Sequence, residues 1–70
     1  MIMTLKEADE KAHELFGEDS LCAIDGCGRC EVFYEPDGNI QSAVMIGRGD
    51  DFEEAFEQAM THFKRFYAVN

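Results

Sequence analysis

Basic side chains are scarce in this sequence of 70 residues, and tryptophan is missing altogether. Six lysines and arginines stand against 15 acidic residues, which gives a formal net charge of −9. Direct binding of DNA or RNA needs lysine and arginine to displace the counterions of the phosphates, and anionic membranes attract the same basic groups. We therefore expect neither a nucleic acid nor a membrane as a direct partner.

Long apolar runs are also missing. No stretch approaches the ~18 consecutive apolar residues of a transmembrane helix. The opening residues MIMTLKEADEKA lack the basic start and apolar core of a signal peptide. The chain has three cysteines, an odd number that fits a reducing compartment better than a disulfide framework. We expect a cytoplasmic protein.

Two amphipathic helices are predicted in one domain that covers residues 1–70. The first spans about 5–16, where Thr4 and Glu7 have the spacing of a capping box and apolar residues recur at helical spacing. The second spans about 51–67, with Asp50 as the expected N-cap. Acids crowd its first turns and bases its last turn, which complements the helix dipole.

Three short strands are predicted between these helices, at about 20–25, 30–35 and 40–46, since these segments are rich in β-branched and aromatic residues. Turn residues at 36–39 predict a hairpin between the second and third strands, and Gly47–Gly49 is interpreted as part of the loop before the second helix. The predicted fold is α+β: an αβββα two-layer sandwich, with a three-stranded antiparallel meander and two helices on one face.

The segment CAIDGCGRC holds all three cysteines and leaves three interpretations open. Zinc is the first, with Cys22, Cys27 and Cys30 as ligands and either His13 or His62 as the fourth. Thiol redox chemistry at the C-x2-C pair is the second. The third is a hairpin with small buried thiols and Cys27 exposed at the turn. We favour the hairpin, and expect no metal and no cofactor.

Strand alternation predicts an exposed apolar patch on the sheet. If Val32 and Tyr34 face the helices, then Glu31, Phe33 and Glu35 face outward. If Val44 and Ile46 also face the helices, Met45 faces outward near Phe33. An exposed apolar patch with a polar rim is typical of an interaction site.

The αβββα order resembles the double-stranded-RNA-binding domain in topology. That family has a lysine-rich start to its second helix, where this sequence reads Asp50-Asp51-Phe52-Glu53-Glu54. Because the sign of the charge is reversed, the resemblance does not imply RNA binding here. In size, acidity and element order the chain is also similar to small phage-encoded inhibitors of the anti-CRISPR type. That resemblance implies a nucleic-acid mimic that occupies a nucleic-acid-binding surface.

No catalytic constellation stands out, so we expect a non-enzymatic protein that binds a basic surface of a larger protein. Its candidate partner-binding residues lie on both helices and on the open sheet: Glu7, Glu10, Glu14, Glu31, Phe33, Glu35, Met45, Asp50, Asp51, Glu53, Glu54 and Glu57. Two alternatives stay open. One is a small zinc or thiol module built on the cysteines, and the other is a homodimer formed through the open sheet.

Overall fold

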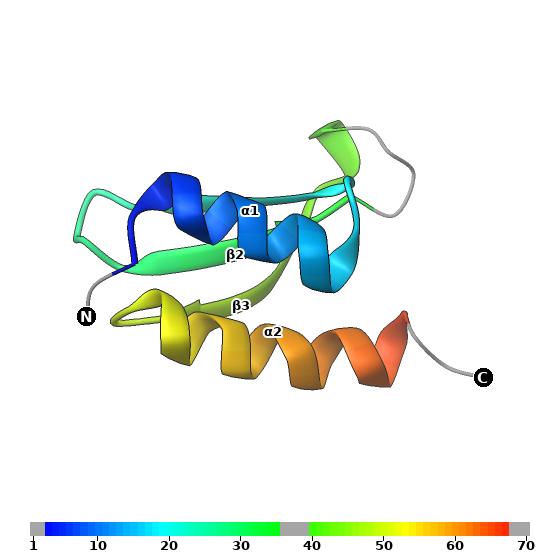
Figure 1. Cartoon of the computed structure of the whole chain (residues 1–70). Helices are drawn as coiled ribbons and strands as arrows, with labels where there is room; N and C mark the ends of the chain where they lie inside the picture. The colour runs from blue at the N-terminus through cyan, green and yellow to red at the C-terminus, as the bar shows by residue number, and fades with distance from the viewer. Residues whose placement is uncertain (1–2, 36–39, 68–70) are drawn as a thin grey trace.

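The computed structural model describes residues 3–35 and 40–67. The elements follow the predicted αβββα order (Figure 1): α1 (Leu5–Phe16), β1 (Ser20–Ile24), β2 (Cys30–Tyr34), a short 3-10 helix η1 (Ile40–Ser42), β3 (Val44–Gly49) and α2 (Phe52–Phe66). The strands form an antiparallel sheet in the order β1-β2-β3. The predicted α+β fold is confirmed, including the three-stranded meander.

Helix α1 begins and ends with the residues that the sequence indicated. The Thr4 hydroxyl accepts from the Glu7 backbone N–H at 3.2 Å, and the Glu7 carboxylate accepts from the Thr4 N–H at 3.0 Å. This reciprocal capping box satisfies two backbone donors that the helix itself leaves free. Gly17 ends the helix with a φ of +93°, in the region that favours glycine.

Side chains of α1 fasten it to the outer edge of β1. The Cys22 backbone N–H donates to Asp9 Oδ1 at 2.9 Å. His13 Nε2 lies 3.0 Å from the Ser20 carbonyl oxygen. Because a carbonyl can only accept, this ring nitrogen carries the proton. Two backbone groups on the open side of an edge strand are thereby satisfied by the neighbouring helix.

The third strand differs from the prediction of 40–46. Residues 40–42 form η1, and β3 runs from Val44 to Gly49, through the glycines that were expected in a loop. These glycines are buried beneath α2. A Cβ on Gly47 would collide with the Ala55 carbonyl oxygen and lie 2.7 Å from Ala59 N, so they serve close approach between backbones. The predicted turn at 36–39 lies outside the described residues.

A β-bulge lies where β3 passes under the helix. Val32 pairs with Gly47 while Phe33 pairs with Met45, which leaves Ile46 as the extra residue. Ile46 and Gly47 are both buried. The bulge therefore places two consecutive residues of β3 against α2 and breaks the simple alternation of faces.

Helix α2 begins one residue later than expected, and its N-cap is Asp51, which corrects the prediction of Asp50. The Asp51 carboxylate accepts from the Glu54 N–H at 2.8 Å. The helix ends at Phe66, where Lys64 and Arg65 occupy the last turn. Because β3 continues to Gly49, Asp50 forms the connection between the strand and the N-cap residue Asp51.

Both helices pack on the same face of the sheet and run in the same direction (Figure 1). The ring of Phe16 on α1 lies 5.0 Å from Phe63 and 6.4 Å from Phe56, both on α2. Small residues fill the centre beneath them, with Ala8, Ala12, Ala55 and Ala59 fully buried. Val32 and Tyr34 face this core, as the alternation predicted.

We expect Gly47→Ala to lower the free energy of unfolding. The added methyl group has no space because backbone atoms of α2 occupy it. Overpacking of this kind costs about 1–3 kcal/mol. Urea denaturation followed by circular dichroism measures the change. Gly26→Ala is the matched control, since a Cβ there meets nothing within 4 Å; equal stability of the two variants would contradict the close-packing account.

Candidate functional site

Asp25 organises the turn between β1 and β2. Its Oδ1 accepts from the backbone N–H groups of Cys27 at 2.8 Å and Arg29 at 2.9 Å. Its Oδ2 accepts from Arg48 Nη2 on β3 at 2.7 Å. The hydrogen bond from the Arg29 N–H, followed by that from Arg48, holds the pKa of Asp25 below its ordinary value. One carboxylate thus fixes the turn and joins it to the third strand.

The three cysteines of CAIDGCGRC occupy two environments. Cys22 and Cys30 are buried on the sheet face that meets the helices, and Cys27 is exposed in the turn. Burial is the main reason that the pKa of Cys22 rises to about 12, with the charge of Asp9 as a second cause. Burial likewise raises the pKa of Cys30, aided by Asp51 and Asp25. Both buried thiols are therefore held neutral at pH 7.

Among the described residues, no three histidine, cysteine, aspartate or glutamate side chains are grouped as a metal site. The two histidines named for the zinc hypothesis lie apart. His13 contacts the Ser20 carbonyl at the β1 edge. His62 packs against Phe66, with ring centroids 4.6 Å apart, on the flank of α2. Strands β1 and β2 pair antiparallel across this segment, which is the hairpin of the third interpretation.

Some of the predicted acidic residues make contacts that stabilise the fold, and others only face solvent. Glu7 and Asp51 cap helices. Glu31 Oε2 lies 3.6 Å from Arg48 Nε, and Asp50 Oδ1 lies 3.8 Å from Arg29 Nε. Within residues 3–35 and 40–67, no ion pair or side-chain hydrogen bond involves the carboxylates of four exposed residues, Glu10, Glu14, Glu53 and Glu57. We call these four the acidic helix surface.

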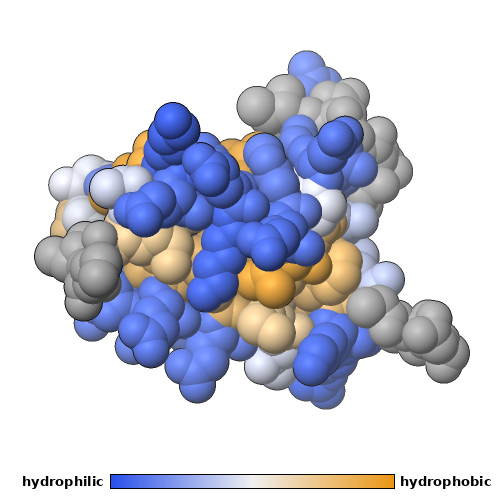
Figure 2. All heavy atoms as spheres, viewed as in Figure 1, coloured by the Kyte–Doolittle hydropathy of each residue, from blue (hydrophilic) through white to orange (hydrophobic). Residues whose placement is uncertain are grey.

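The acidic helix surface lies on the side of both helices that faces away from the sheet. Ala8 and Ala12 are buried on one side of α1, so helical spacing turns Glu10 and Glu14 outward. On α2, Ala55 and Ala59 are buried, which turns Glu53 and Glu57 outward in the same way. Figure 2 shows hydrophilic residues over both helices, with an apolar strip between them. Leu15, Met60 and Phe63 line that strip.

A hollow opens at the N-terminal ends of the two helices, beside the β1–β2 turn. Asp50, Asp51 and Glu53 line it together with Lys11 and Ile24. Both helices point their N-termini toward this end (Figure 1). Carboxylates here stabilise the partial positive charge of each helix. The lining of the hollow thus carries three acidic side chains and one basic side chain.

The opposite side of the molecule is the open sheet face. Leu21, Phe33 and Met45 pair across the three strands on this face. The next row along the strands pairs Ala23, Glu31 and Arg48. Phe33 is half-buried and Met45 is 41% exposed. Glu35 follows β2, and its backbone N–H donates to the Asp19 carbonyl at 2.7 Å.

The candidate partner-binding residues therefore fall on two opposite faces. One face carries the acids of both helices, and the other carries Phe33, Met45 and Glu31. A single flat partner surface cannot contact both faces at once. Glu54 belongs to neither, since it lies on the flank of α2 next to β3. The structure thus brings the helix acids together and separates them from the sheet patch.

Sequence reasoning missed the roles of Asp9, His13 and Asp25. Each acts through a contact with the backbone of another element or with a distant side chain. The sequence favoured a hairpin turn within CAIDGCGRC, and the acceptor role of Asp25 is typical of such turns. No local pattern signals that Asp9 or His13 reaches the edge of a strand.

Comparison with known protein families, curated proteins and solved structures found no match to the chain. No helix of the described residues combines the length and apolarity needed to cross a bilayer.

We expect Cys27 alone to react rapidly with iodoacetamide in the native protein. Its thiol is exposed, whereas burial shields Cys22 and Cys30 and raises their pKa values. Mass spectrometry should count one fast alkylation in buffer and three in urea. Cys27→Ser should remove the fast phase. Rapid labelling of Cys22 would contradict the fold, and labelling of Cys27 only after addition of a chelator would favour zinc.

Acid should remove the contribution of Asp25 to stability. A lowered folded-state pKa means that this contribution is complete above the unfolded-state value of about 3.9 and is lost as the pH falls through the folded-state value. Asp25→Asn keeps an acceptor oxygen for the turn but loses the ion pair with Arg48. As the pH falls below about 4, we expect the urea concentration at the midpoint of unfolding to decrease less for this variant than for the wild type.

Asp19→Asn is the control for that experiment, because its exposed carboxylate has no ion pair among the described residues. A wild-type pH profile that Asp25→Asn leaves unchanged would show that Asp25 does not contribute.

Proposed function

We propose that the chain is a non-enzymatic interaction protein of the cytoplasm that binds a basic surface of a larger protein. The acidic helix surface makes the contact, and the hollow beside Asp50, Asp51 and Glu53 receives a basic side chain. The observation that carries this proposal is that Glu10, Glu14, Glu53 and Glu57 have no ion pair among the described residues. Their charge is available to a partner without the loss of an internal contact.

The arrangement of these acids favours a basic partner over a neutral one. The exposed carboxylates lie on two helices that pack on one face of the sheet and run in the same direction (Figure 1). The net charge of −9 adds a long-range field of the same sign. Such a field accelerates encounter with a positive patch and disfavours negative partners. The apolar strip between the helices offers a small area that a partner can desolvate.

The most concrete version is an inhibitor that occupies a nucleic-acid-binding surface, as anti-CRISPR-type proteins do. A surface that holds phosphates is rich in lysine and arginine. Carboxylates on the two helices present negative charge to such a surface, as the phosphates of a nucleic acid do. The negative charge of the chain and the resemblance in size and element order support this version.

Competition with nucleic acid tests the proposal. The chain would be used to capture partners from a nuclease-treated lysate, and each captured protein would be purified and offered a labelled nucleic acid. We expect the chain to displace that nucleic acid, and the displacement to weaken as salt rises because exposed charges are screened. Glu53→Lys/Glu57→Lys should raise the concentration needed by about tenfold, because reversal turns attraction into repulsion.

The double variant Glu18→Lys/Asp19→Lys is the matched control, since it changes the net charge equally in the loop after α1. Equal loss of competition in both variants would assign the effect to net charge rather than to the helix surface. No loss in Glu53→Lys/Glu57→Lys would contradict the proposed contact.

A further inference from the structure

The two edges of the sheet differ in what covers them. Helix α1 closes the outer edge of β1, since Asp9 accepts from the Cys22 N–H there. His13 donates to the Ser20 carbonyl on the same edge. Strand β3 forms the other edge, and within residues 3–35 and 40–67 its backbone makes hydrogen bonds to β2 only. An edge strand with free N–H and C=O groups is a template for another strand.

The pairing of β2 shows which backbone groups of β3 point to the free edge. The Glu35 N–H, just after β2, donates to the β1 side. Because backbone groups point alternately to the two sides of a strand, Phe33 and Glu31 also make their hydrogen bonds to β1. Their partners on β3 are Met45 and Arg48. The backbone N–H and C=O groups of Met45 and Arg48 therefore point away from β2, to the free edge.

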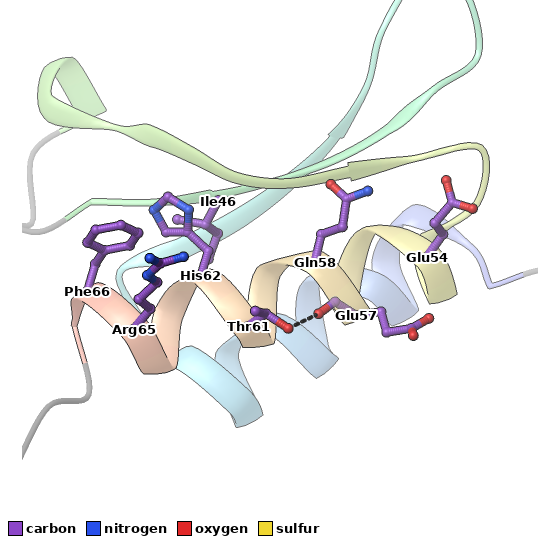
Figure 3. A pocket seen from close by; sticks show the side chains of 8 residues that line it. All are labelled: Ile46, Glu54, Glu57, Gln58, Thr61, His62, Arg65 and Phe66. Atoms are coloured by element: carbon purple, nitrogen blue, oxygen red, sulfur yellow. Dashed lines mark hydrogen bonds between the residues drawn. The ribbon is translucent and has the colours of Figure 1, made fainter.

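A groove runs between this edge and the neighbouring flank of α2. Ile46 lines it from the strand. The helix lines it with six polar or charged residues, which we call the α2 flank: Glu54, Glu57, Gln58, Thr61, His62 and Arg65. Figure 3 shows Glu54, Gln58 and His62 on the side of α2 that faces β3. The groove therefore combines free backbone groups on the strand with polar side chains on the helix.

The charge of the α2 flank changes along its length. Glu54 and Glu57 lie in the first two turns of the helix, Gln58 and Thr61 lie near its centre, and Arg65 lies in its last turn. The flank is negative at one end, neutral in the middle and positive at the other end. A segment that carries both signs of charge, in the right order, is complementary to it, whereas a uniformly basic segment meets repulsion at Arg65.

Helix α2 runs antiparallel to β3, which fixes where each charge lies along the edge. Gly49, the last residue of β3, lies directly beneath Glu54. At the other end of the strand, Val44 pairs with Tyr34, whose ring centroid lies 5.1 Å from that of Phe63 near the end of α2. The acidic end of the groove therefore lies beside the end of β3, and the basic end lies beside its start.

The groove has room for one extended strand. Strand β2 lies about 4.8 Å to one side of β3, and its residues Val32 and Tyr34 pack into the core beneath the helices. An added strand would lie at the same distance on the other side of β3. It would approach α2 no more closely than β2 already does. Because a single peptide strand carries no helix of its own, nothing else has to fit above the sheet.

We propose that this groove binds an extended segment of a partner protein, which joins the sheet as a strand antiparallel to β3. In such strand addition the main chain provides affinity, and alternate side chains provide specificity. A segment that mirrors β2 has five central residues. Its second and fourth residues pair with Arg48 and Met45, whose side chains lie on the open sheet face. Its first, third and fifth residues then face α2, because side chains alternate along a strand.

The α2 flank selects the side chains at these three positions. The first residue lies across from Gly49 and beside Glu54, where a lysine or arginine is favoured. The third residue lies beside Ile46, which favours an apolar side chain. The fifth residue lies across from Val44 and near Arg65, where a glutamate or aspartate is favoured. The recognised pattern is basic, any, apolar, any, acidic, in the direction from the N-terminus to the C-terminus of the segment.

Two synthetic peptides of the same composition test this proposal. Both have blocked ends; one is Ser-Lys-Thr-Val-Thr-Glu-Ser and the other is its reverse, Ser-Glu-Thr-Val-Thr-Lys-Ser. Each would be titrated into the 15N-labelled full chain and followed by NMR. We expect the first peptide to bind about tenfold more tightly, because only its charges match both ends of the groove. The amide signals of Met45 and Arg48 should shift as it binds.

Variants of the α2 flank test the charge contacts. Glu54→Lys and Arg65→Glu should each weaken binding of the first peptide by about tenfold, because each places like charges opposite one another. Glu53→Lys and Lys64→Glu are the matched controls. They make the same changes of charge at neighbouring residues that line other hollows of the molecule, and they should leave binding unchanged. Circular dichroism confirms that each variant is folded.

N-methylation of the peptide tests the main-chain contacts. The N–H of the central threonine before the glutamate donates to β3, so its N-methylation should abolish binding. The valine N–H points to solvent, so its N-methylation should have little effect. Equal effects at the two positions would exclude strand addition. Absence of binding at millimolar peptide, or equal affinity for the two peptides, would overturn the proposed pattern. Because Glu54 and Arg65 lie outside the acidic helix surface, these results are independent of the function proposed above.

Discussion

The direct contact between α2 and the backbone of β3 determines most of what this small molecule can present. Gly47 and Gly49 have no side chains, so the helix lies on the strand itself with Ala55 and Ala59 as its contact residues. That position turns Glu53 away from the sheet and leaves Glu54, Glu57, Gln58 and Arg65 along the groove beside Ile46 of β3. A larger residue at either glycine would displace the helix, and the acidic side chains on it would move with it.

This contact also explains where prediction from the sequence succeeded and failed. The first helix and the first two strands could be predicted from local sequence, because the Thr4–Glu7 capping box and the turn at Asp25 are made by neighbours in the chain. The third strand was misplaced because Gly47 and Gly49 resemble loop residues when the helix above them is unknown. The contact of Asp9 and His13 with the edge of β1 was missed for the same reason, since it joins residues 7 to 13 positions apart.

The acidic residues of the chain have different roles. Asp51 caps a helix, Asp25 holds a turn, and Asp9 closes an edge strand. These carboxylates are needed by the fold whatever the protein binds. Sequence alone could not separate them from Glu10 and Glu57, because all of them are acidic residues in acidic surroundings. Only the tertiary contacts show which carboxylates have partners within the described residues, and that Glu10, Glu14, Glu53 and Glu57 lie on the helices, on the side opposite Phe33 and Met45.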